Sequence, residues 1–290
     1  MARQTTDYNL GIINTRCTNP MTCYHSKPAW KTGLSNENGK HPIRFNFRDQ
    51  TADYFIDCGK CEGCRVKQRR DWAIRMYHEA QSHEWNSFVT LTYSDQNLPQ
   101  DGKISKPDLQ KFLKRLRKQL NDKIRYYIVG EYGEMTRRPH YHACFFGSDF
   151  RGPNSYNIRP GVWGNPHLDH IWKQGHVEIA EFNLATAMYT AGYVTKKAGD
   201  TDTFSLQSRN PPLGKEWVRK YHDQLRRIKA IPINGTEHPI PSIYLRWLEG
   251  TEIQTEIKEA LTHKTRNDKQ LKNKKINQIQ NTKILRKQKI

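Results

Sequence analysis

The sequence predicts an α+β protein in which helices pack on one side of a central antiparallel sheet. Three observations carry this expectation: short segments rich in β-branched and aromatic residues, amphipathic segments of helical period between them, and enough aromatic residues to fill a core. Aromatic residues make up 11% of the 290 residues and include seven tryptophans. Disordered chains are poor in such residues, so most of this chain is expected to fold.

The predicted strands are short segments in which apolar and polar residues alternate or β-branched and aromatic residues cluster. They cover residues 86–94, 124–132, 138–147 and 175–182. The short turn from Gly133 to Arg137 joins the second strand to the third, which predicts an antiparallel hairpin. Glycine, proline and asparagine crowd residues 151–166, and proline recurs over 232–241, so both segments are expected to be loops.

The predicted helices repeat apolar residues every three or four positions. They cover residues 66–80, 105–121, 183–199 and 212–230. Ser105 and Asn183 stand where an N-cap residue is expected. Arginine and lysine residues line the polar faces of the first two helices, so these faces are candidate phosphate-contacting surfaces, with plain solvated helix faces as the alternative.

Composition divides the chain into four parts. Residues 1–80 are a cysteine-rich region with a basic helix, 81–200 a compact α+β domain, 201–257 a helical accessory region, and 258–290 a basic, flexible tail. Lysine and arginine number 48 against 29 aspartates and glutamates, so the formal net charge is +19. A protein this basic usually meets a polyanion, most often nucleic acid. The tail would add sequence-independent attraction to phosphates.

Two classes of protein fit the sequence poorly. No stretch approaches the roughly 18 consecutive apolar residues that a membrane-spanning helix needs. The first ten residues, MARQTTDYNL, lack the apolar core of a signal peptide. We therefore expect neither a membrane partner nor a secreted disulfide scaffold.

A His-x-His pair lies on the third predicted strand. His140 and His142 project from one face because side chains alternate along a strand, and two imidazoles on one face can share a divalent cation. Glu131, nine residues before His140, is positioned to add an oxygen ligand, with Glu134 as its competitor. Such a set suits Mn²⁺, or Mg²⁺ with waters completing the shell. Two sheet histidines bonded to water or backbone are the common alternative.

A second pattern lies on the helix predicted over 183–199. Tyr189 and Tyr193 are four residues apart, so they lie one above the other on the same face, and Lys196 and Lys197 follow them. A phenol is a poor nucleophile at pH 7, but a nearby ammonium and a metal-polarised phosphate would both help it. Together with the His pair and the basic charge, the pattern fits attack of a tyrosine oxygen on a DNA phosphodiester. Taken alone, a pair of packed aromatic residues is the simpler explanation.

The order of these motifs resembles that of a known superfamily. A strand FVTLTY, then PHYH, then a Tyr-Lys helix is similar to the HUH endonucleases that initiate rolling-circle replication. Two tyrosines four residues apart resemble the two-tyrosine class, and CGKCEGCR followed by RRDWAIR resembles the replication initiators of gokushovirus-type microviruses. The resemblance covers residues 58–197 and departs at Gly192, where the gene A pattern has a lysine before the second tyrosine.

The resemblance implies a fold and a role for each motif. The sheet would be RRM/ferredoxin-like, and His140 and His142 would bind the catalytic Mg²⁺ or Mn²⁺. Tyr193 and Tyr189 would be the nucleophiles, with Lys196 and Lys197 as phosphate or proton-transfer partners.

The implied activity is that of a site-specific, metal-dependent DNA endonuclease that also joins strands. It would nick viral origin DNA in the double-stranded replicative form through a 5′-phosphotyrosine, leave a 3′-OH primer, and close the displaced strand into a single-stranded circle. The chain has no Walker-type motif, so a host helicase and a host DNA polymerase would assist in the cytoplasm of the bacterial host cell. The rivals are a relaxase or transposase with the same chemistry, and a non-catalytic, zinc-stabilised nucleic-acid-binding protein.

Three cysteines in one tight segment indicate a second metal site. Cys58, Cys61 and Cys64 are each separated by two residues, and a structural Zn²⁺ needs a fourth ligand. The candidates for that ligand are Cys17, Cys23 and His25. A ferredoxin-type cluster fits less well, because Gln68 stands where a fourth cysteine would follow. Free thiols in a reducing cytosol are the alternative.

Overall fold

The protein is described by a computed structural model that covers residues 23, 25–33, 42–45, 54–120, 123–133, 135–196 and 203–261. The chain divides into two compact units, residues 1–64 and 65–290. The first unit holds a small antiparallel sheet in the order β2-β1-β3. Its strands are β1 (Lys27–Lys31), β2 (Ile43–Arg44) and β3 (Tyr54–Ile56). The four-part division from composition stays a prediction, and residues 65–80 belong to the larger unit.

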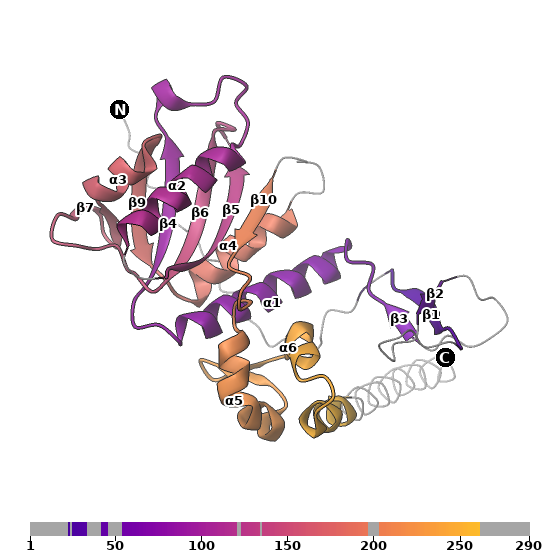
Figure 1. Ribbon diagram of the computed structural model, residues 1–290. Helices are drawn as coiled ribbons and strands as arrows, with labels where there is room; N and C mark the ends of the chain where they lie inside the picture. The colour runs from indigo at the N-terminus through magenta and orange to yellow at the C-terminus, as the bar shows by residue number, and fades with distance from the viewer. Residues whose placement is uncertain are drawn as a thin grey trace, which may run out of the picture. The chain divides into compact units, whose positions relative to one another are not determined.

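The second unit is built on a seven-stranded antiparallel sheet in the order β10-β5-β6-β4-β9-β8-β7 (Figure 1). Its strands are β4 (Asn86–Tyr93), β5 (Arg125–Tyr132), β6 (Pro139–Phe146), β7 (Tyr156–Arg159), β8 (Val162–Gly164), β9 (Gly175–Glu181) and β10 (Phe204–Gln207). The four predicted strands are confirmed as β4, β5, β6 and β9. Their order, β9-β4-β6-β5, with one helix after β4 and another after β6, is the βαββαβ arrangement of ferredoxin-like folds.

All four predicted helices are present. The helices are α1 (Glu62–Ala80), α2 (Lys106–Gln119), α3 (Pro166–Trp172), α4 (Leu184–Lys196), α5 (Lys215–Ile228) and α6 (Ser242–Trp247), with a further helix over 252–261 and a short 3₁₀ turn, Asp95–Asn97. Both predicted caps form: the Ser105 hydroxyl accepts from the amide of Asp108, and the Asn183 side chain accepts from the amide of Thr186. Within the described residues, no helix is long and apolar enough to cross a bilayer.

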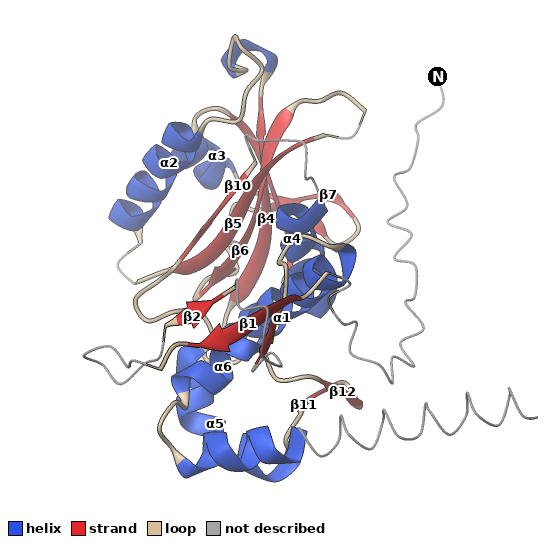
Figure 2. Ribbon diagram, turned by 90° about the vertical axis from the view of Figure 1, so that its right-hand side faces the viewer, coloured by secondary structure: helices blue, strands red, loops and turns tan. Residues whose placement is uncertain are grey.

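Helices cover both faces of the large sheet, so the expectation of helices on one side is wrong. On one face, α2 and α3 pack on residues such as Val89, Ala143 and Phe145. On the other, α1 and α4 pack on residues such as Val129 and Phe146 (Figure 2). The reason is in the strands themselves, because β5 and β6 bury successive side chains and therefore need an apolar cover on each face.

Two predicted loops contain hairpins. Residues 151–166 include β7 and β8, and residues 232–241 lie across β11 (Ile231–Ile233) and β12 (Thr236–His238). The second turn is Asn234-Gly235, with φ of 49° and 75°, which is the turn chemistry that two-residue hairpins favour. Proline does not prevent strand formation there, because a two-stranded ribbon leaves one side of each strand unpaired.

The accessory region packs on α1. Ile74 of α1, Trp217 of α5 and Tyr244 of α6 belong to one buried cluster, which also includes the β11–β12 hairpin. The predicted flexible tail begins inside the helix over 252–261, and residues 262–290 lie outside the described residues.

Candidate active site

The hairpin of β5 and β6 brings Glu131 and the histidine pair together. Glu131 is the direct cross-strand partner of His140, and Val129 is that of His142. Because side chains alternate along each strand, all three polar side chains face the α4 layer. β6 is an interior strand between β5 and β4, so this cluster sits on a rigid part of the sheet.

One carboxylate oxygen joins both imidazoles. Oε1 of Glu131 lies 2.7 Å from Nε2 of His140 and 3.1 Å from Nε2 of His142. Only 6% of Glu131 and 5% of His142 is exposed. Burial alone would raise the pKa of the Glu131 carboxyl, but hydrogen bonds from His140 and His142 outweigh it and hold that pKa below its ordinary value. Burial lowers the pKa of His142 against the opposing pull of Glu131, which favours neutral imidazole.

Both tyrosines of α4 reach this cluster. The Tyr193 ring stacks on His142, with centroids 5.2 Å apart and an interplanar angle of 14°. The Tyr189 hydroxyl lies 3.5 Å from Nε2 of His142, and the two tyrosine rings meet edge to face at 4.6 Å. Burial first, and then hydrogen bonds with Tyr189 and Glu131, raise the pKa of Tyr193, so its phenol is held protonated in this arrangement.

Three further groups orient the histidines. The Thr90 hydroxyl on β4 lies 3.1 Å from Nδ1 of His142, and the Phe88 ring stacks on the same imidazole at 5.5 Å. Nδ1 of His140 donates to the backbone carbonyl of Arg138 at 3.2 Å. Sequence reasoning missed these residues, although alternation along FVTLTY places Phe88 and Thr90 on one face; which strand that face adjoins is not a local property.

The donor set suits a divalent cation. The ligand atoms of Glu131, His140 and His142 lie within 4.8 Å of one another. Each histidine has its Nδ1 engaged by a fixed oxygen and its Nε2 turned toward the carboxylate, which is how protein metal sites orient imidazole ligands. Two imidazoles and a carboxylate accept Mn²⁺, and Mg²⁺ when waters complete the shell.

Some predicted residues cannot be compared with the structure. Lys196 is the last residue of α4, but its side chain is not described. Lys197 and Glu134, the competitor of Glu131, lie outside the described residues.

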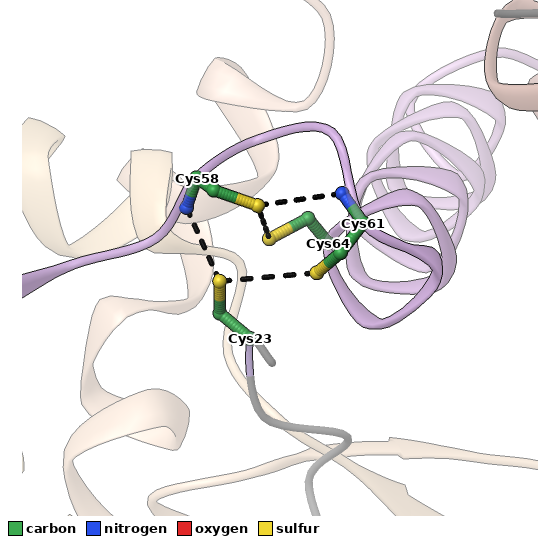
Figure 3. Close-up of side chains that lie close together, drawn as sticks. All are labelled: Cys23, Cys58, Cys61 and Cys64. Carbon is green, nitrogen blue, oxygen red and sulfur yellow. Dashed lines mark hydrogen bonds between the residues drawn. The ribbon is translucent and has the colours of Figure 1, made fainter. Parts of the chain in front are cut away.

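The cysteine site takes a definite form in the first unit. Cys23, Cys58, Cys61 and Cys64 come together, with their sulfur atoms within 4.8 Å of one another (Figure 3). Of the other candidates for the fourth ligand, His25 is exposed and does not belong to this group, and Cys17 lies outside the described residues.

Several arginines predicted to face phosphates are engaged inside the protein instead. Arg69 donates to the carbonyl of Met188, and Arg75 donates to that of Leu213. Arg115 donates to the last carbonyls of α3, those of Ile171 and Trp172. The lysines of α2 are exposed, but α2 covers the face of the sheet opposite to α4.

Comparison with known proteins places the motifs in one family. The family model of the replication-associated protein ORF2 matches residues 86–198, which run from β4 through the end of α4. Replication-associated protein VP4 of Bdellovibrio phage phiMH2K is 33% identical over 218 residues, covering 68% of this chain and 69% of the relative. The chain belongs to the replication-associated protein ORF2 family. The predicted resemblance to microvirus replication proteins is thereby confirmed.

Two other members of the replication-associated family are similar to the chain. ORF2 of Spiroplasma virus 4 is 31% identical over 210 residues, and ORF4 of Chlamydia phage 1 is 31% identical over 233 residues. The matches cover 66% and 71% of this chain, and 64% and 58% of the two relatives. No solved structure matches the chain.

Proposed function

We propose that this family member is a viral rolling-circle replication initiator, which nicks origin DNA and later rejoins the displaced strand. The observation that carries the proposal is the convergence of two phenols, two imidazoles and one carboxylate on one face of the sheet. Family membership adds the link to phage replication. The net charge of +19 supports DNA as the substrate.

The proposed reaction is a transesterification. The phenol oxygen of Tyr193 or Tyr189 attacks the phosphorus, the bond to the 3′-oxygen breaks, and the 5′-phosphate is left on the tyrosine. The released 3′-oxygen takes a proton and becomes the primer for the host polymerase. Because one phosphoester replaces another, the reverse step can close the displaced strand into a circle without ATP.

The protein's own groups account for the proton and the geometry. Tyr193 hydrogen-bonds to Glu131, and Tyr189 meets His142, so each phenol has a proton acceptor beside it. The interior strand β6 and helix α4 hold these groups in place before DNA arrives, which lowers the entropic cost of reaction. A Mg²⁺ or Mn²⁺ held by Glu131, His140 and His142 would polarise the scissile phosphate. Lys196 and Lys197 complete the proposal as phosphate or proton-transfer partners.

The direct test uses supercoiled replicative-form DNA of the cognate virus with Mg²⁺ or Mn²⁺. We expect nicked circles and DNA covalently bound to protein. Each single change, Tyr189→Phe or Tyr193→Phe, should leave part of the adduct, and the double change should abolish it. His140→Ala should lower nicking by about 10²-fold or more, because positioned metal and acid–base groups contribute that much.

The matched control is Tyr156→Phe, because Tyr156 is exposed on β7, at the far edge of the sheet from β6. It should nick like the wild type. Retarded but uncut DNA, unchanged by His140→Ala, would instead favour a non-catalytic nucleic-acid-binding protein. Nicking without release of single-stranded circles would favour the relaxase or transposase alternative and the same chemistry on another substrate.

A further inference from the structure

We propose that Cys23, Cys58, Cys61 and Cys64 bind one structural Zn²⁺ that holds the N-terminal unit together. The four residues come from two segments that are far apart in sequence. Cys23 precedes β1, whereas the other three lie in the loop after β3 and in the first turn of α1. The proposal concerns a site separate from the histidine cluster and assigns the fourth ligand to Cys23.

The spacing of the sulfur atoms fits a single tetrahedral ion. A Zn–S bond is about 2.3 Å, so the edge of a regular tetrahedron of sulfurs is about 3.8 Å. The Sγ atoms of Cys58 and Cys64 are 3.9 Å apart, and those of Cys61 and Cys23 are 3.8 Å apart. These two pairs include all four ligands. A disulfide would need about 2.05 Å, and a multi-iron cluster would push the sulfurs farther apart to make room for its own atoms.

Backbone amides already point at the sulfur atoms that would carry negative charge. The amides of Lys60 and Cys61 donate to Sγ of Cys58 at 3.5 and 3.4 Å. The amides of His25 and Cys58 donate to Sγ of Cys23 at 3.4 and 3.2 Å. Such donors stabilise thiolates, which are the form that binds zinc. Gly59 permits the turn that aims these amides, since its φ is 73°.

The N-terminal unit has little else to hold it. Among its described residues, the only buried apolar side chains are those of Ala29 and Cys64. Ile43, Phe45 and Phe55 are 44%, 52% and 69% exposed. Small units that cannot bury a core usually depend on a metal or on disulfides, and these cysteines are free.

The site also closes the small sheet at its end. β1 and β3 pair with Lys27 opposite Ile56, so the chain before β1 and the chain after β3 emerge side by side. Cys23 and Cys58 lie just beyond this pair and are already joined by the Cys58 amide. An ion bound there would fix both ends of the sheet to the start of α1.

The test is metal analysis of the full chain, purified without chelator and passed through a desalting column. We expect about one zinc per chain, and cobalt substitution should give the visible bands of a tetrahedral thiolate site. Cys23→Ser should lower retained zinc several-fold. Cys17→Ser and Cys144→Ala are the matched controls and should keep it, because Cys144 is buried in the other unit against Thr190.

Two further variants keep the proposal falsifiable if Cys23→Ser folds poorly. Cys23→His should keep zinc and shift the cobalt spectrum, because imidazole can replace one thiolate. The double change His140→Ala and His142→Ala should keep zinc as well. Folded wild-type chain without zinc, with iron in its place, or with zinc that Cys17→Ser or the histidine change removes would overturn the proposal.

Discussion

Both ring nitrogens of His142 are engaged, and this sets its role. Nε2 faces Glu131 and Tyr189, and Nδ1 faces the hydroxyl of Thr90 on the neighbouring strand. A group that fixes the far nitrogen of a metal-binding imidazole orients the ring and tunes its basicity. Thr90 is therefore a positioning residue in the proposed site.

Thr90→Val removes that partner at nearly constant volume. We expect the Mn²⁺ affinity of the nicking reaction to fall about 10-fold, with the DNA affinity unchanged, because removal of this kind of partner costs about 10- to 100-fold. Titration of nicking with Mn²⁺ checks this. Thr92→Val is the control, since the Thr92 hydroxyl donates to the His176 carbonyl instead; equal Mn²⁺ dependence in both variants would contradict the role given to Thr90.

At the scale of elements, the packing of α1 on α4 explains Gly192. Arg69 of α1 donates to the carbonyl of Met188, and a Cβ built at Gly192 would lie 3.1 Å from its Nε and 3.3 Å from its Cζ. Glycine at this position lets the guanidinium lie flat on the helix. The lysine of the gene A pattern is thus replaced here by close packing with a cation from another helix.

Gly192→Lys should therefore crowd Arg69 and destabilise the unit by about 1–3 kcal/mol, the usual cost of overpacking. In a chain that also carries Arg69→Ala, the cost should shrink by more than half. Thermal and urea denaturation of the two single variants and the double variant measure the coupling. Strictly additive effects would show that the two positions are independent.

A second packing feature of α1 makes stability depend on pH. His78 of α1 stacks on Trp217 at 3.5 Å and hydrogen-bonds to the Tyr244 hydroxyl at 2.9 Å. Burial lowers the pKa of His78 to about 3. The unfolded chain takes up a proton near pH 6.5 that the folded chain refuses until about pH 3, so stability is complete above pH 6.5 and falls below it.

The slope of the free energy of unfolding from this group should approach about 1.4 kcal/mol per pH unit between those values. His78→Asn should be less stable than the wild type at about pH 7.5, and the difference should narrow as the pH falls. His222→Asn, at an exposed histidine of α5, should keep the wild-type slope. Denaturant titrations at several pH values test this, and parallel curves for wild type and His78→Asn would refute it.

The sequence predicted the site where the rules are local and failed where they are not. Alternation along a strand and the four-residue helical repeat were enough to bring Glu131, the histidines and the tyrosines together. Thr90 and Arg69 depend on which strand or helix lies alongside, which no local period encodes. The ligand Cys23 needed closure of a long loop, and the Asn234-Gly235 turn was hidden by neighbouring prolines.

At the scale of the whole molecule, charge separates attraction from chemistry. The proposed reacting groups sit on the large sheet and α4, whereas residues 262–290 carry ten basic residues and one acidic residue. Deleting them lowers the formal net charge from +19 to +10. Each phosphate that the protein no longer neutralises should reduce the slope of log affinity against log salt by about 0.9.

We expect the shortened chain to bind non-specific duplex more weakly, with a shallower salt dependence, and to nick at the wild-type rate when DNA saturates it. A tail of the same length with glutamine in place of lysine and arginine should behave like the deletion. Binding measured at several salt concentrations tests this, and an unchanged slope would show that the charged tail does not touch DNA.

The central claim is that a tyrosine of α4 becomes covalently joined to DNA. The most direct measurement is mass spectrometry of the nicked complex after digestion with nuclease and protease. The account predicts a nucleotide attached through a 5′-phosphate to Tyr193 or Tyr189. Attachment at a residue outside α4, or nicked DNA that carries a free 5′-phosphate and no protein, would contradict it.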